Sequence, residues 1–76
     1  MDSIEQKILE RLSEKFGTSP KLSDGLAYVG ADSLGMAELT VEIESDFGIT
    51  VTDEIFQIET VQELADYVRE RQSEGV

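Results

Sequence analysis

The sequence contains no cysteine and no histidine. Without cysteine the chain can form no disulfide bond, no thiolate metal site and no cysteine nucleophile. Without histidine it lacks the usual general base and the commonest metal ligand. A Ser–His–Asp triad therefore cannot be assembled from this chain alone. We expect no catalytic residues and no metal site, and a carrier or binding protein rather than an enzyme.

Basic residues are also few. Six Lys and Arg residues stand against 17 Asp and Glu residues, which gives a net charge of −11. Nucleic acids and anionic membrane surfaces require positive charge, so neither is expected as a partner. The negative charge suits steering toward proteins with basic patches, although it could equally serve solubility alone.

Long hydrophobic runs are missing as well. No segment approaches the roughly 20 apolar residues of a membrane span. The first residues lack the basic start and the apolar run of a signal peptide, so we expect a cytoplasmic protein.

The length of 76 residues predicts a single domain over 1–76, and we expect a monomer. A domain of this size buries only about 60% of its unfolded surface, which leaves little room for a deep active site.

Two capping boxes mark the outer helices. Residues 3–6, Ser-Ile-Glu-Gln, predict a helix with Ser3 as its N-cap, and apolar residues then recur at helical spacing as far as Phe16. Residues 60–63, Thr-Val-Gln-Glu, predict a final helix that runs to about Gln72.

The central part predicts one further long helix and a short one. Residues 18–31 show no steady period and are expected to form a long loop. The second helix should begin at Asp32 or Ser33 and end at Phe47, before Gly48, and an extended connection then leads to one or two helical turns over 53–58. The predicted fold is all-α, a small four-helix bundle of three longer helices and one short helix, with a long loop between the first and second helices.

The second helix carries two apolar stripes, whereas a surface helix needs only one to face the core. We assign the longer and bulkier stripe to the core. The shorter stripe is either buried too, because the helix is central, or exposed as a docking stripe with an acidic border. The longer stripe is Met36, Leu39, Ile43 and Phe47, and the shorter one is Leu34, Ala37 and Val41.

Ser33 lies where the long loop meets the second helix. One interpretation is ordinary: Asp32 is the N-cap and Ser33 the first helical residue. The other is an attachment site, because a phosphate on Ser33 would meet free N–H groups and the positive end of the helix dipole. Gly35 is unusual so far inside a helix, where it costs about 0.5–1 kcal/mol relative to Ala.

Residues 29–34, Val-Gly-Ala-Asp-Ser-Leu, resemble the hydrophobe-Gly-x-Asp-Ser-Leu signature of acyl carrier proteins. The resemblance extends to Glu38-Leu39, to residues 47–51 and to residues 60–68, and so covers nearly the whole chain. Position 35 departs from the common bacterial pattern, where an acidic residue is usual, and residues 53–59 are more apolar than in the housekeeping form. These departures indicate a specialised member of the family.

The resemblance implies that Ser33 is the attachment residue for 4′-phosphopantetheine, with Asp32 assisting. A holo-carrier synthase, which is a phosphopantetheinyl transferase, would use Mg²⁺ and coenzyme A to attach it. The thiol at the end of the phosphopantetheine arm would then carry acyl groups as thioesters for fatty acid, related lipid or polyketide biosynthesis. The implied partner-binding residues are Leu34, Ala37, Glu38 and Val41, and the implied acyl pocket is lined by Leu39, Ile43, Phe56 and Val61.

Three alternatives remain open. The chain could be an aminoacyl or peptidyl carrier, or a carrier-like interaction module that is never modified. Glu42 and Asp46 stand four residues apart on one helix, and could in principle bind a divalent cation. Such a pair more often only repels.

Overall fold

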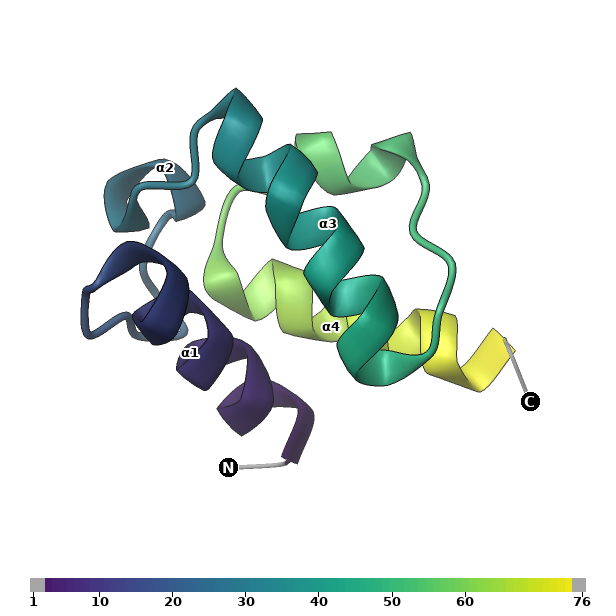
Figure 1. Ribbon diagram of the computed structural model, residues 1–76. Coiled ribbons are helices and arrows are strands. Elements are labelled where there is room, and N and C mark those ends of the chain that lie inside the picture. Colours follow the sequence, from purple (N-terminus) through teal and green to yellow (C-terminus); the bar gives the residue numbers. More distant parts are fainter. Residues whose placement is uncertain (1–2, 75–76) are drawn as a thin grey trace.

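The computed structural model describes residues 3–74, and Figure 1 shows its helices. No β-strand occurs in this part of the chain, where the one β-bridge pairs Gly25 with Thr60. The all-α prediction, with three longer helices, is therefore confirmed. The elements in chain order are α1 (Ser3–Phe16), α2 (Leu26–Val29), α3 (Ser33–Phe47), the 3₁₀ helix η1 (Asp53–Gln57) and α4 (Val61–Glu74).

The ends of α1 and α3 follow from local chemistry. Asp32 is the N-cap of α3, as predicted, and its side chain accepts a hydrogen bond from the N–H of Gly35. Gly17 and Gly48 end α1 and α3 in the left-handed conformation, with φ of 67° and 64°, which glycine adopts most readily. The N-cap prediction for Ser3 is wrong, because Ser3 is the first described residue of α1 itself.

The start of α4 agrees with the second capping box. The Oγ1 atom of Thr60 accepts a hydrogen bond of 3.1 Å from the N–H of Glu63, which satisfies one of the free donors of the first turn. The helix continues to Glu74, slightly beyond the expected end. The extended connection before η1 is tied to α4, because the Tyr67 hydroxyl accepts from the N–H of Thr52 at 3.0 Å.

The loop between α1 and α3 is less irregular than predicted, because the single turn α2 interrupts it. Leu26 and Val29 bury their side chains, and the N–H of Leu26 donates to the carbonyl of Glu59 at 2.7 Å. The N–H of Val61 donates to the carbonyl of Asp24 at 3.0 Å, so the loop is fastened to the start of α4. A turn this short carries no helical period in the sequence.

The core lies between α1, α3 and α4 and is closed by η1. In Figure 1, α3 crosses α4, and α1 lies beside both. Among the described helices, none combines the length and the apolar character that a membrane span needs. The most completely buried side chains are Ile8, Leu12, Leu39, Ile43, Ile55, Val61, Leu64 and Val68.

Candidate functional site

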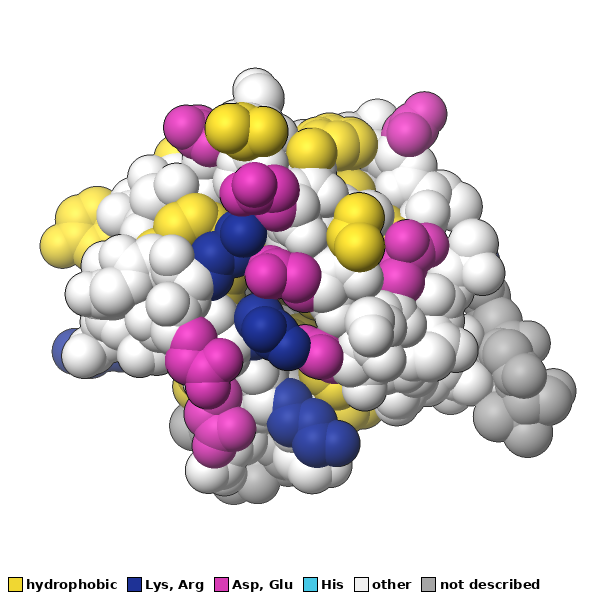
Figure 2. Space-filling view, viewed as in Figure 1, with side chains coloured by type: hydrophobic (Ala, Val, Ile, Leu, Met, Phe, Trp, Pro, Cys, Tyr) yellow, Lys and Arg dark blue, Asp and Glu magenta, His cyan; other side chains and the backbone are white. Residues whose placement is uncertain are grey.

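The shorter apolar stripe of α3 is exposed to solvent. Leu34 is 70% exposed and Val41 65%, and Ala37 is exposed as well. The longer stripe is turned inward, since Met36 and Ile43 are buried. The alternative in which both stripes are buried is therefore wrong. Figure 2 shows hydrophobic groups on this face of the molecule with acidic side chains between them.

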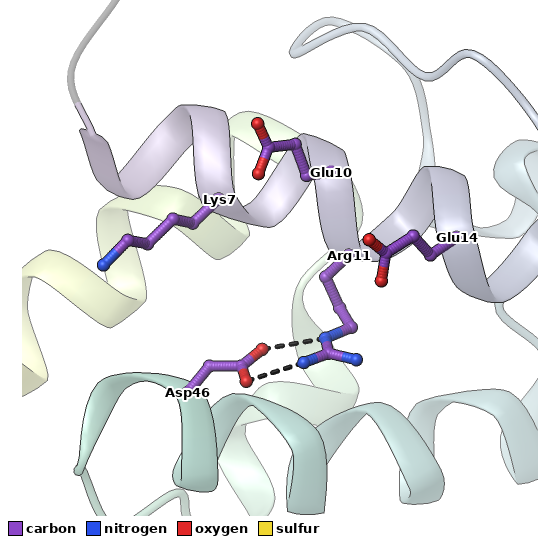
Figure 3. A pocket seen from close by; sticks show the side chains of 5 residues that line it. All are labelled: Lys7, Glu10, Arg11, Glu14 and Asp46. Carbon is purple, nitrogen blue, oxygen red and sulfur yellow. Dashed lines mark hydrogen bonds and ion pairs between the residues drawn. The ribbon is translucent and has the colours of Figure 1, made fainter.

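The flank of α3 that faces α1 is held by ion pairs. The guanidinium of Arg11 donates to both carboxylate oxygens of Asp46, with distances of 2.8 Å and 2.6 Å. These two residues close one side of a polar hollow that Lys7, Glu10 and Glu14 also line (Figure 3). The hydrogen bond to Asp46 raises the pKa of Arg11. Arg11 therefore joins the middle of α1 to the end of α3.

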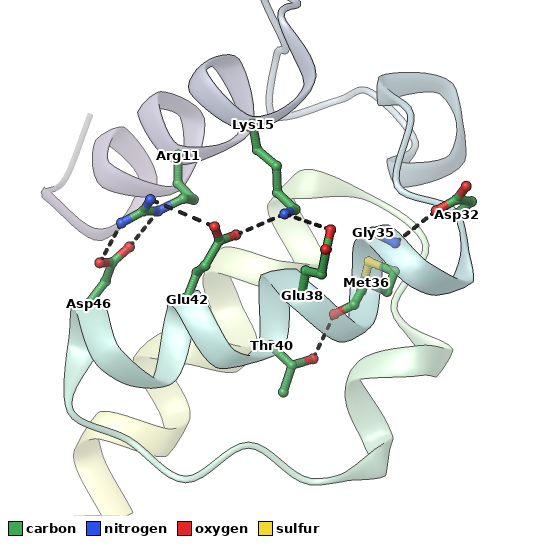
Figure 4. Close-up of polar contacts among 9 residues, drawn as sticks. All are labelled: Arg11, Lys15, Asp32, Gly35, Met36, Glu38, Thr40, Glu42 and Asp46. Atoms are coloured by element: carbon green, nitrogen blue, oxygen red, sulfur yellow. Dashed lines mark hydrogen bonds and ion pairs between the residues drawn. The ribbon is translucent and has the colours of Figure 1, made fainter.

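Lys15 extends this row of ion pairs toward the start of α3 (Figure 4). Its Nζ atom lies 3.1 Å from Oε1 of Glu38 and 3.3 Å from Oε1 of Glu42. The hydrogen bond to Glu38 raises the pKa of Lys15. Glu38 was expected to meet a partner protein, and its carboxylate, which stays 57% exposed, also binds a cation of its own chain.

The pair Glu42 and Asp46 is also used internally. Arg11 lies 4.0 Å from Glu42 and 2.6 Å from Asp46, so the two carboxylates share one guanidinium. No group of three or more potential metal ligands forms within residues 3–74. The repulsion between Glu42 and Asp46 is thus offset by Arg11 of α1.

Ser33 is the first residue of α3, and its side chain is exposed. Beside it, Oδ1 of Asp32 accepts from the N–H of Gly35 at 2.8 Å, as Figure 4 shows. The carbonyl of Asp32 accepts from the N–H of Met36 at 2.8 Å. The hydroxyl of Ser33 therefore stands at the positive end of a capped helix, where a phosphate would be stabilised.

Gly35 is buried, and the reason is the ring of Phe16. A Cβ atom at position 35 would lie 3.1 Å from Cε1 and 3.2 Å from Cζ of that ring. These distances are too short for a side chain unless the ring moves. The sequence could not show this, because only the packing of α1 on α3 brings Phe16 to the first turn of α3.

A depression of about 500 Å³ opens beside Ser33. Its lining includes Ser33 and Met36 of α3, Leu26 and Ala27 of α2, and Phe56 and Ile58 from the segment around η1. Apolar side chains thus stand next to an exposed hydroxyl. This combination suits a flexible group that is attached to Ser33 and has apolar parts.

Of the residues predicted to line an acyl pocket, only Phe56 lines this depression, and it is 55% exposed. Leu39, Ile43 and Val61 are at most 1% exposed and belong to the packed core. This depression therefore does not bring the four residues together. The sequence reasoning missed Met36, which lies three residues after Ser33 on α3, and Ile58, whose place beside Ser33 depends on how the segment after η1 packs.

An exposed serine at a capped helix start, beside an apolar depression in a small helical bundle, defines a carrier-type domain. Comparisons with known proteins give the family. A family profile described as “phosphopantetheine attachment site” matches residues 6–68. Two relatives named acyl carrier protein, from Rickettsia canadensis and Rickettsia prowazekii, are each 38% identical over 77 aligned residues, which cover 95% of this chain and 90% of theirs.

A solved structure agrees with the sequence comparison. The crystal structure of an acyl carrier protein from Thermotoga maritima superposes with a TM-score of 0.80 at 26% identity, and the match covers 97% of this chain and 96% of that one. The chain belongs to the phosphopantetheine-attachment family and, within it, to the acyl carrier proteins. The prosthetic group of this family is 4′-phosphopantetheine.

Proposed function

We propose that the chain carries acyl groups as thioesters on 4′-phosphopantetheine attached to Ser33, in fatty acid or related lipid or polyketide biosynthesis. The observation that carries this proposal is the position of Ser33. Its exposed hydroxyl stands at the N-terminus of α3, next to the capping carboxylate of Asp32 and at the rim of the depression.

The residues at this site fit the group. The Oγ atom of Ser33 is a free nucleophile for a phosphoryl centre, and the start of α3 stabilises the phosphodiester that results. In the attachment reaction, Oγ displaces adenosine 3′,5′-bisphosphate from coenzyme A, and the serine proton passes to a base of the transferase. When bound, the group supplies a terminal thiol for thioester formation. Met36, Phe56 and Ile58 offer apolar surface to its arm and cargo.

The partners under this proposal are a phosphopantetheinyl transferase and acyl-transferring or synthase enzymes with basic docking patches. Leu34, Ala37 and Val41 supply an exposed apolar stripe for them, and the net charge of −11 favours their approach. The protein presents a covalent intermediate to these enzymes as a monomer and is not itself a catalyst. The role implies a cytoplasmic location, where coenzyme A is supplied.

The test is the intact mass after incubation with coenzyme A, Mg²⁺ and a broad-specificity phosphopantetheinyl transferase. The wild type should gain the mass of one phosphopantetheinyl group, and Ser33→Ala should gain none. Ser45→Ala is the matched control, because Ser45 is another exposed serine on α3. A wild type that was unmodified at the start and stays unmodified, while a known carrier reacts, would point to an interaction module instead.

A further inference from the structure

The ring of Phe16 contacts the chain on both sides of Ser33. A Cβ atom at Gly35 would lie 3.1 Å from Cε1 of Phe16, and one at Gly30 would lie 3.5 Å from Cδ1. Gly30 ends α2 and Gly35 lies in the first turn of α3. The two glycines bracket residues 31–34, and one aromatic ring supports both.

The bracketed segment is also fixed by its own hydrogen bonds. The N–H of Ala31 donates to the carbonyl of Leu26 at 2.9 Å, and the N–H of Asp32 donates to the carbonyl of Gly30 at 3.0 Å. At the other side, Asp32 holds the N–H of Gly35. A side chain at position 35 would meet Oδ1 of Asp32 at 3.2 Å as well as the ring. Both the Phe16 ring and the capping carboxylate of Asp32 therefore require that position 35 has no side chain.

Phe16 is itself held in place. It is the last residue of α1, and the next residue, Gly17, turns the chain away with a φ of 67°. The preceding residue, Lys15, is ion-paired with Glu38 on α3, and its Nζ atom lies 5.9 Å from the centre of the Phe16 ring. The end of α1 is thus joined to the start of α3 by packing and by charge together.

We infer that Phe16 is a positioning residue for the modification of Ser33. Seated on Gly30 and Gly35, its ring holds the end of α2 and the first turn of α3 in one arrangement, so that the Ser33 hydroxyl is presented at a fixed place. The inference rests on the proposed function. It matters because group transfer is sensitive to orientation: a displacement of ~1 Å can lower a rate by about 100-fold.

The experiment measures kcat and KM for phosphopantetheine transfer to four variants. Phe16→Ala should lower kcat about tenfold or more with little change in KM, because the exposed stripe is intact. Gly35→Ala should also lower kcat, because its methyl group displaces the ring. Phe16→Leu combined with Gly35→Ala should recover most of the wild-type kcat, because leucine at position 16 is smaller than phenylalanine and leaves room for the methyl group at position 35. The control is Val68→Ala, which removes fully buried volume from α4 and should lower the melting temperature while leaving kcat unchanged.

Hydrogen exchange at the Gly35 amide gives a readout that needs no transferase. Exchange should be faster in Phe16→Ala than in Val68→Ala, because only the first variant loosens the cap at Asp32. Equal kcat in Phe16→Ala and Val68→Ala would overturn the positioning role. A kcat of the double variant below that of Gly35→Ala alone would overturn it as well. A wild type that accepts no phosphopantetheine would instead overturn the proposed function, and the exchange comparison would still decide whether the ring holds the segment.

Discussion

Arg11 and Asp46 form a two-point ion pair that joins α1 to α3, with Nε to Oδ2 at 2.8 Å and Nη2 to Oδ1 at 2.6 Å. Together with Lys15, Arg11 neutralises three carboxylates on one flank of α3. Because α3 has no basic residue of its own, these contacts offset the repulsion among its carboxylates. The exposed apolar stripe of Leu34, Ala37 and Val41 lies on the outer face of α3, next to this flank.

Replacing Arg11 by Met should lower the free energy of unfolding by up to about 1 kcal/mol, because the pair is partly exposed and salt screens it. Lys21→Met is the control for the change in net charge, since Lys21 also lies on the surface. Urea denaturation at low and high salt measures the free energy of unfolding of both variants. The difference between the variants should shrink at high salt. A difference that is unaffected by salt would show that Arg11 acts through packing of its stem instead.

The stability that Lys15 provides should disappear at high pH. Its hydrogen bond with Glu38 raises its pKa above the ordinary value of 10.5. A raised pKa in the folded state means that the contribution is fully present below 10.5 and is lost as the pH rises through the folded value. Wild type should therefore melt at a higher temperature than Lys15→Met near neutral pH, and this difference in melting temperature should close as the pH rises through the raised pKa of Lys15. A gap that persists undiminished at high pH would refute the ionic origin.

Asp32 should have separable roles in folding and in modification. Asp32→Ala removes the cap on Gly35 and should cost about 1 kcal/mol of stability, whereas Asp32→Asn keeps an oxygen acceptor and should cost much less. If the carboxylate also assists the transfer to Ser33, both variants should be modified slowly. Thermal melting and intact-mass kinetics measure the two effects. Normal modification of Asp32→Asn would limit Asp32 to its capping role.

Much of the fold was predictable because its signals are local. Gly17 and Gly48 end helices through their own backbone conformations, and Asp32 and Thr60 cap helices through atoms only three residues away. The turn α2 was not predictable, because four residues carry no helical period and its first residue, Leu26, donates its N–H to the distant Glu59.

The contrast between local signals and contacts with residues distant in the sequence also applies to the site. The place of Ser33 at a helix start followed from its neighbours, while its attachment role stays a prediction. The partner of Glu38 and the reason for Gly35 lie on α1, and nothing near either residue in the sequence indicates Lys15 or Phe16.

Val41 should matter for docking and not for folding. Val41→Ser changes a side chain that is 65% exposed, so its effect on stability should stay within about 0.5 kcal/mol. The KM of the transferase should rise, because apolar contact area is lost. Ser45→Ala on the same helix should leave KM unchanged. An unchanged KM for Val41→Ser would show that the transferase does not use the exposed stripe.

A short acyl chain on the holo protein should first meet the depression beside Ser33 and not the core. Met36, Phe56 and Ile58 line that depression, whereas Leu39 and Val61 show no exposure. Close-packed side chains have no room for a chain of several methylenes unless the helices separate, which would cost the contacts between them. Nuclear Overhauser effects from an isotope-labelled acyl chain should therefore reach Phe56 and Ile58, and Phe56→Ala should weaken those to Ile58. Strong effects to Leu39 and Val61 with none to Phe56 would instead mean that the cargo opens the core, and that the cavity forms only when the chain is bound.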